Sequence, residues 1–134
     1  MKNYLIILII PVLLFLLSGC GQKNVGQTAN DFVSDNNGNI VEITSEGFNP
    51  STLMIKSGET ATWVNKESLP SWPASAVHPS HNAYPESGGC LGSKFDACRR
   101  LKQGESYSFT FNQKGTWKYH DHLSPGDTGT IIVE

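Results

Sequence analysis

All four histidines of this chain fall within two short stretches of the sequence. His78 and His81 stand three positions apart in H-P-S-H, and His120 and His122 flank an aspartate in H-D-H. Imidazole nitrogens suit Cu(II) and Zn(II), and a carboxylate such as that of Asp121 can complete the coordination shell of such a metal. A metal site forms here only if the fold brings the two stretches together.

Each stretch also has an interpretation that involves no metal. His78 and His81 are then surface histidines beside prolines, and His120 precedes a loop without binding anything. Asp121 is then a turn residue that accepts hydrogen bonds from the loop backbone, or a residue that orients a ligating imidazole. These alternatives stay open at the level of the sequence.

The segments that carry and surround the histidines have the alternating pattern of β-strands. In residues 116–120, Trp117 and Tyr119 share one face, and continued alternation turns Asp121 to that face and His120 to the other. Similar alternation predicts strands over 40–43, 53–56, 60–65, 106–111 and 129–133, with no amphipathic helix of useful length. Short strands separated by turn signals predict an all-β sandwich or barrel.

Residues 66–103 lack a strand pattern and are rich in proline and glycine. Loops of this length are uncommon in compact domains and are often functional. Cys90 and Cys98 lie within this segment, and we expect them to form a disulfide that restrains the unfolded chain by about 2–3 kcal/mol in the entropy model. A metal-binding thiolate pair is the less favoured alternative, because the segment contains no C-x-x-C spacing. Asp96, between the cysteines, is interpreted as a turn residue.

The N-terminus has the features of a bacterial lipoprotein signal. Lys2 precedes an apolar run over 5–17, and the following Leu17-Ser18-Gly19-Cys20 resembles a lipobox. This predicts a signal peptide over 1–19, lipidation of Cys20, and attachment to a membrane on the extracytoplasmic side of the envelope, at the periplasmic face or the cell surface. An uncleaved anchor is the alternative. Residues 20–39 predict a flexible tether, which leaves 40–134 as one domain.

Three blocks of residues 40–133 resemble the cupredoxins, the small blue-copper β-sandwich proteins. The blocks are F-N-P-S-T-L-M-I-K-S-G-E-T-A-T-W-V-N from Phe48, G-E-S-Y-S-F-T-F from Gly104, and G-T-W-K-Y-H-D-H-L-S-P-G-D-T-G-T-I-I-V from Gly115. The resemblance implies a Greek-key sandwich of about seven strands, here with one long loop insertion. It also implies a metal site at one end of the sandwich, where the two histidine-bearing loops meet.

The cupredoxin copper ligands themselves are replaced in this chain. The positions that align with the family's His, Cys, His and Met ligands are occupied by Ser71, Asp121, Ser124 and Asp127. A type 1 blue site requires the cysteine thiolate, because the Cys–copper bond defines its geometry. The resemblance therefore implies the fold without blue copper chemistry.

Three functional hypotheses follow from these observations. The first is a membrane-anchored protein that binds copper, or alternatively zinc, through His78, His81, His120 and His122, with Asp121 as a further candidate ligand, and that has a protein partner for metal transfer or electron exchange. The second is a metal-free cupredoxin module whose long loop binds a protein or a surface polymer. The third, an enzyme such as a copper redox module, is least favoured because such enzymes usually need several domains or several coppers. The formal net charge of −2 gives no indication of nucleic-acid binding, and we expect a monomeric domain.

Overall fold

The computed structural model of the chain describes residues 38–134. The expected signal peptide, the lipid-bearing Cys20 and nearly all of the tether therefore lie outside the described residues. Within 38–134 there are eight β-strands and no helix, so this part of the chain has no helix that could cross a membrane. The strands are β1 (Ile40–Thr44), β2 (Gly47–Asn49), β3 (Thr52–Ile55), β4 (Thr60–Asn65), β5 (Pro73–Ser75), β6 (Ser106–Thr110), β7 (Gly115–Asp121) and β8 (Thr128–Val133).

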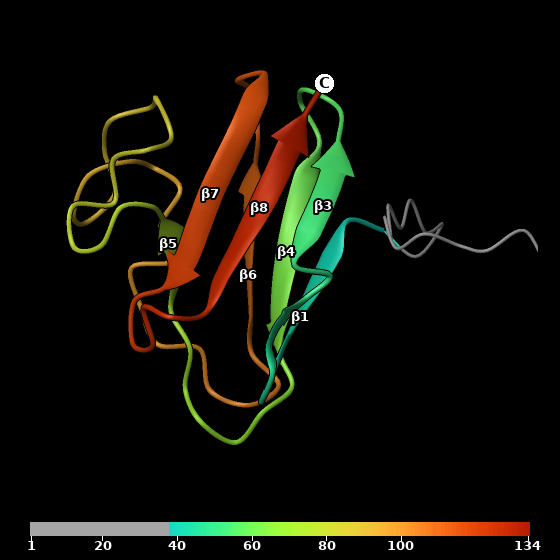
Figure 1. Ribbon diagram of the computed structural model, residues 1–134, viewed down its shortest axis with the longest axis vertical. Coiled ribbons are helices and arrows are strands. Elements are labelled where there is room, and N and C mark those ends of the chain that lie inside the picture. Colours follow the sequence, from blue (N-terminus) through green and yellow to red (C-terminus); the bar gives the residue numbers. More distant parts are fainter. Residues whose placement is uncertain (1–37) are drawn as a thin grey trace, which may run out of the picture.

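The strands form two four-stranded sheets that pack face to face as a sandwich (Figure 1). One sheet has the order β2-β1-β4-β6 and the other has the order β3-β8-β7-β5. β1 pairs parallel to β4 and β3 pairs parallel to β8, while the remaining neighbours are antiparallel. The two sheets confirm the all-β sandwich predicted from the alternating segments.

Trp63 of β4 lies at the centre of the core and is fully buried. Aromatic rings from both sheets pack against it, including that of Tyr119 from β7 at a centroid distance of 5.3 Å. Two further core side chains, Tyr84 and Phe95, come from the part of the long segment (residues 66–103) that follows β5, and each is at most 1% exposed. Burying two such large rings stabilises the fold by several kcal/mol. The long segment therefore contributes side chains to the hydrophobic core.

The structure corrects the expectation that residues 66–103 have no strand. Pro73–Ser75 forms β5, an edge strand that pairs with β7, and single bridges join Ser71 to Leu101 and Ala74 to Asp96. β5 was missed because it is only three residues long and begins with a proline, which an edge strand tolerates at its first position. β2 was missed for a similar reason, since Gly47–Asn49 resembles a turn.

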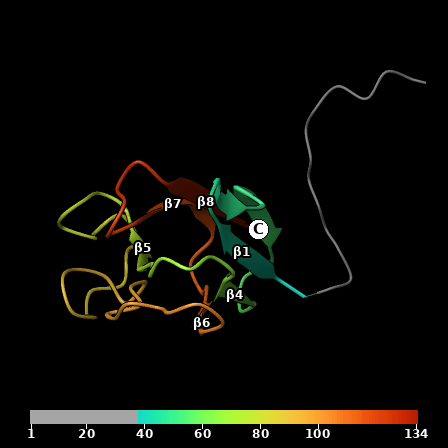
Figure 2. The ribbon, with the colours of Figure 1, turned by 90° about the horizontal axis from the view of Figure 1, so that it is seen from below.

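The part of the long segment that follows β5 stands at the side of the sandwich, next to β5 and β7. Figures 1 and 2 show its loops, in olive and yellow, clustered beside β5 in both views. The backbone N–H of Ser75 donates to the Phe95 carbonyl at 2.8 Å, and that of Ala97 donates to the Pro73 carbonyl at 3.0 Å. These bonds hold the segment against the end of β7 that carries the histidines.

Candidate metal centre

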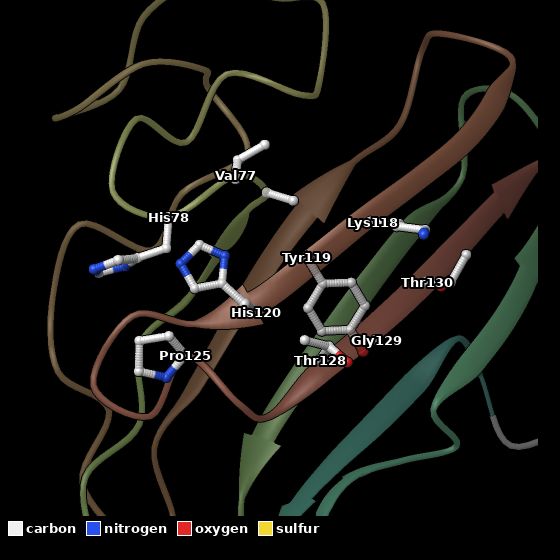
Figure 3. Close-up of a pocket in the computed structure, with 10 residues that line it drawn as sticks. Val77, His78, Lys118, Tyr119, His120, Pro125, Thr128, Gly129 and Thr130 are labelled. Carbon is white, nitrogen blue, oxygen red and sulfur yellow. The ribbon is translucent and has the colours of Figure 1, made fainter.

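The four histidines converge beside the C-terminal end of β7. Their ligand nitrogens all lie within 4.8 Å of one another, so that one ion could contact all four. His81 is fully buried, His120 is 3% exposed, His122 is half-buried and His78 is exposed. Figure 3 shows the His78 and His120 rings next to each other, and their centroids are 5.4 Å apart. The structure thus brings together all four histidines that were predicted from the sequence as candidate ligands.

Strand β7 positions His120 on the face opposite to the core. Tyr119 points into the sandwich, and successive side chains of a strand point to opposite faces. His120 pairs in register with Ala74 of β5 and is buried because the long segment covers this side of the sheet. Alternation had predicted the direction of His120, and the cover over it comes from the tertiary fold.

His122 follows directly after β7 and is held by Trp72. Its backbone N–H donates to the Trp72 carbonyl at 2.8 Å. The indole ring of Trp72 packs against the imidazole of His122, with the ring centroids 4.5 Å apart. These two contacts direct His122 into the cluster although it lies in a loop.

His81 enters the cluster from a tight bend of the long segment. Its backbone φ of 49° lies in the left-handed region, which histidine adopts more readily than most residues. Ser93 donates its backbone N–H to the His81 carbonyl at 2.8 Å. The residue before Ser93 is Gly92, where a Cβ would collide with the carbonyl oxygen of Ser80. A glycine is therefore required for the two chain segments to approach this closely.

The ring nitrogens of His81 both have partners. Nδ1 lies 2.6 Å from Oδ2 of Asp96, and both side chains are completely buried. Nε2 lies 2.9 Å from Nδ1 of His122. The interpretation of Asp96 as a turn residue was incomplete. Its Oδ1 does accept a turn bond from the Cys98 N–H, but the contact with His81, 15 residues away, had no signal in the sequence.

Two imidazoles of the cluster, those of His120 and His122, are biased toward the neutral form. Burial lowers the pKa of His120 from 6.5 to about 4, and the three neighbouring histidines contribute to the same direction. Burial also lowers the pKa of His122. Neutral imidazole is the form that binds a metal. Moreover, neither ring nitrogen of His120 has a hydrogen-bond partner in the structure, although both are buried. Buried ring nitrogens without hydrogen-bond partners are uncommon in folded proteins. Their presence here fits a histidine that binds a metal ion.

The positions predicted to replace the type 1 ligands offer hydroxyl and carboxylate oxygens. Oδ1 of Asp121 accepts the backbone N–H groups of Trp72 at 2.9 Å and of Leu123 at 2.8 Å, as expected of a turn residue. Asp121 is absent from the group of convergent ligand atoms, and its role as a ligand stays a prediction. Ser71 is fully buried with an unpartnered hydroxyl. These residues carry neither the thiolate nor the imidazole of a type 1 ligand set.

Cys90 and Cys98 form the expected disulfide. They are the two cysteines within residues 38–134, so this part of the chain offers no thiolate while the disulfide is intact. The disulfide closes the loop that contains Asp96. The side chain of Asp96 connects this loop to the histidine cluster through its contact with His81.

An open groove of about 470 Å³ flanks the cluster on the side of His78 and His120 (Figure 3). Val77 and Pro125 border it on two sides, and Lys118 and Thr130 lie farther along the sheet. The groove exposes one edge of the cluster to solvent, whereas His81 on the other side is sealed.

Comparison with known proteins places this fold in an established family. The family model of copper-binding proteins of the plastocyanin/azurin family matches residues 38–134. Amicyanin from Paracoccus denitrificans is 30% identical over 95 residues, which are 71% of this chain and 64% of that protein. Plastocyanin from Scenedesmus fuscus is 35% identical over 94 residues, 65% of this chain and 86% of that protein. The solved structure of a Cu(I) amicyanin mutant has a TM-score of 0.59 at 26% identity, covering 76% of this chain and 86% of that one.

The sandwich is thus a cupredoxin domain. The chain belongs to the plastocyanin/azurin family of copper-binding proteins. The resemblance inferred from the three sequence blocks is confirmed. The chain spans slightly less than two thirds of the Paracoccus amicyanin, so what that protein does as a whole is not carried over.

Proposed function

We propose that this chain binds one copper ion through His78, His81, His120 and His122, at a site distinct from the type 1 position of its family. The observation that carries the proposal is the convergence of four ligand nitrogens within 4.8 Å, with both nitrogens of the buried His120 unpartnered. A buried imidazole without hydrogen-bond partners destabilises the metal-free fold. A bound metal ion would remove part of that cost, because a ring nitrogen would then have a partner.

The donor set favours copper over other divalent ions. Affinity for nitrogen sites rises along the first-row series to a maximum at Cu(II), and Zn(II) binds less tightly. Copper, when bound, supplies an ion that can change between two oxidation states. The histidines hold it, and the cover provided by the long segment excludes water from the His81 side. The exposed His78 and the adjacent groove leave the other side open, which supports a role in holding copper and passing it to a protein partner.

We further propose that the domain is lipid-anchored through Cys20 on the extracytoplasmic side of a bacterial envelope. The support is the lipobox-like Leu17-Ser18-Gly19-Cys20 and the match of the family model from residue 38 onward, which leaves room for a tether. Cells fed a clickable fatty acid should label the wild-type chain and leave Cys20→Ala unlabelled. Equal labelling of both chains would contradict lipidation at this residue.

Copper titration of the purified chain, with the disulfide intact, tests the proposed site. We expect one tightly bound Cu(II) per chain, a paramagnetic resonance spectrum typical of nitrogen ligands, and no intense thiolate-to-copper absorption band. His81→Ala and His122→Ala should each abolish stoichiometric uptake. Asn82→Ala, an exposed neighbour of His81, is the control and should bind as the wild type does.

Two outcomes would change the proposal. Loss of binding in Asp121→Asn, with the fold intact, would show that the carboxylate is a ligand rather than a brace for the loop backbone. Absence of binding in the wild type at micromolar copper would refute the proposed site. Attention would then turn to the long segment as a surface for a protein partner.

Zinc, added in competition, should be displaced by copper.

A further inference from the structure

Asp96 is a buried carboxylate that contacts three hydrogen-bond donors next to the histidine cluster. Its Oδ2 lies 2.6 Å from Nδ1 of His81, and its Oδ1 accepts the indole N–H of Trp72 at 2.6 Å and the backbone N–H of Cys98 at 2.8 Å. Its side chain is completely buried. Hydrogen bonds to an ionised acceptor are short and strong, and these distances agree with a carboxylate anion.

This anion has no lysine or arginine partner among residues 38–134. The ion pairs of Asp96 in this part of the chain are limited to the one with His81. A buried charge without a compensating opposite charge is strongly unfavourable. A cation bound by His81 would provide that compensation through the imidazole ring. Asp96 is thus a buried carboxylate whose charge would be compensated by positive charge at His81, from a proton on the ring or from a bound cation.

Asp96 also determines which nitrogen His81 offers to the cluster. A carboxylate accepts a hydrogen bond from the N–H at Nδ1, so the proton of the neutral ring stays on Nδ1 and its lone pair lies on Nε2. Nε2 is the atom that faces the cluster, 2.9 Å from Nδ1 of His122. Without the carboxylate, the ring would be free to adopt the other tautomer or to rotate.

The same carboxylate acts on a second histidine through Trp72. The hydrogen bond from the indole to Oδ1 fixes the ring that packs against His122 at 4.5 Å. One side chain therefore holds two of the four imidazoles in place, one directly and one through a neighbour.

We propose that Asp96 is the positioning residue of the copper site: it fixes His81 for coordination through Nε2 and, by its negative charge, favours Cu(II) over Cu(I). This inference rests on the proposed copper site. Carboxylates that accept the second N–H of a ligating histidine orient the ring and make it a stronger donor, and their loss typically lowers metal affinity 10–100-fold.

The test compares Asp96→Asn with Asp127→Asn, which removes the same charge from the loop between β7 and β8. Asparagine has the shape of aspartate, and its amide N–H directed at Nδ1 would force the proton of His81 onto Nε2, the wrong nitrogen for the metal. We expect Asp96→Asn to lose about 10–100-fold in Cu(II) affinity, to change the paramagnetic resonance spectrum and to shift the reduction potential to more positive values. Asp127→Asn should match the wild type in all three measurements.

The outcomes separate this inference from the proposed function. If the wild type takes up no copper, the copper site fails and the inference fails with it. If the wild type binds copper and Asp96→Asn has the same affinity, spectrum and potential, the copper site stands and the role of Asp96 is refuted. Should Asp96→Asn not fold, Trp72→Phe serves instead, because it keeps the ring over His122 but removes the donor to Oδ1. A changed resonance spectrum would then support the inference, and an unchanged one would contradict it.

Discussion

Replacing His120 by leucine should stabilise the metal-free protein. Both ring nitrogens of His120 are buried without partners, and the residue is 3% exposed. A buried polar group left without a hydrogen bond destabilises the fold by about 1–3 kcal/mol. Leucine fills a similar volume with apolar atoms and suits a buried strand position. We therefore expect His120→Leu to raise the free energy of unfolding of the metal-free protein by about 1–3 kcal/mol at neutral pH.

The gain should grow in mild acid. The pKa of His120 is lowered to about 4 in the folded protein, against 6.5 for the ordinary group, so the unfolded chain binds this proton more tightly. The wild type should accordingly lose stability as the pH falls from about 6.5 to about 4, with no effect of this group above that window. The full shift corresponds to about 3 kcal/mol at 1.36 kcal/mol per pH unit. We expect about 1–3 kcal/mol, because solvent close to the cluster reduces it.

Urea unfolding of the metal-free protein in a chelator, at pH 7.5 and at pH 5, measures both effects. His78→Leu is the matched control: it is the same substitution at an exposed member of the cluster and should change stability by less than about 0.5 kcal/mol. Copper should reverse the order, since ligand at 1,000 times its dissociation constant stabilises the wild type by about 4.1 kcal/mol and His120→Leu much less. A folded His120→Leu that is less stable than the metal-free wild type would refute the reasoning, because the imidazole would then be a structural group.

Three further predictions concern the disulfide, one glycine and the pH dependence of binding. Replacing Cys90 and Cys98 by serine should reduce the free energy of unfolding by about 2–3 kcal/mol in the entropy model for a sequence separation of 8, and a change below 0.5 kcal/mol in urea unfolding would contradict this. Gly129→Ala should destabilise the domain by about 1–3 kcal/mol or more in thermal unfolding, because the new Cβ would collide with the ring of Tyr119. Gly126→Ala is the control in the same experiment, because a Cβ at Gly126 would project into open space. The contribution of His120 to copper affinity should persist below the ordinary histidine pKa near 6.5 and disappear as the pH approaches its lowered pKa, about 4. A difference in copper affinity between the wild type and His120→Leu that already vanishes between pH 7 and 6 in a competition titration would count against His120 as a ligand.

Much of the fold could be predicted from local sequence. Alternation in β4, β6 and β7 identified the strands and the faces that they bury, because side chains of a strand alternate whatever their tertiary context. The three blocks of family sequence then identified the cupredoxin sandwich. The short strands β2 and β5 were missed, since three residues carry too little periodicity and β5 is defined mainly by its pairing with β7.

The candidate site, like the fold, could be predicted only in part from the sequence. The sequence by itself determined which side chains could serve as ligands, the two stretches that carry them and the outward direction of His120, and it led to the prediction that the type 1 ligands are replaced. The tertiary structure alone decided that the long segment folds over that side of β7, so that an outward histidine is buried. It also placed Asp96 against His81 across 15 residues of an irregular segment. Local patterns encode direction along a strand, but the burial and the partners of a side chain depend on contacts between residues far apart in the chain, and no periodicity records those contacts.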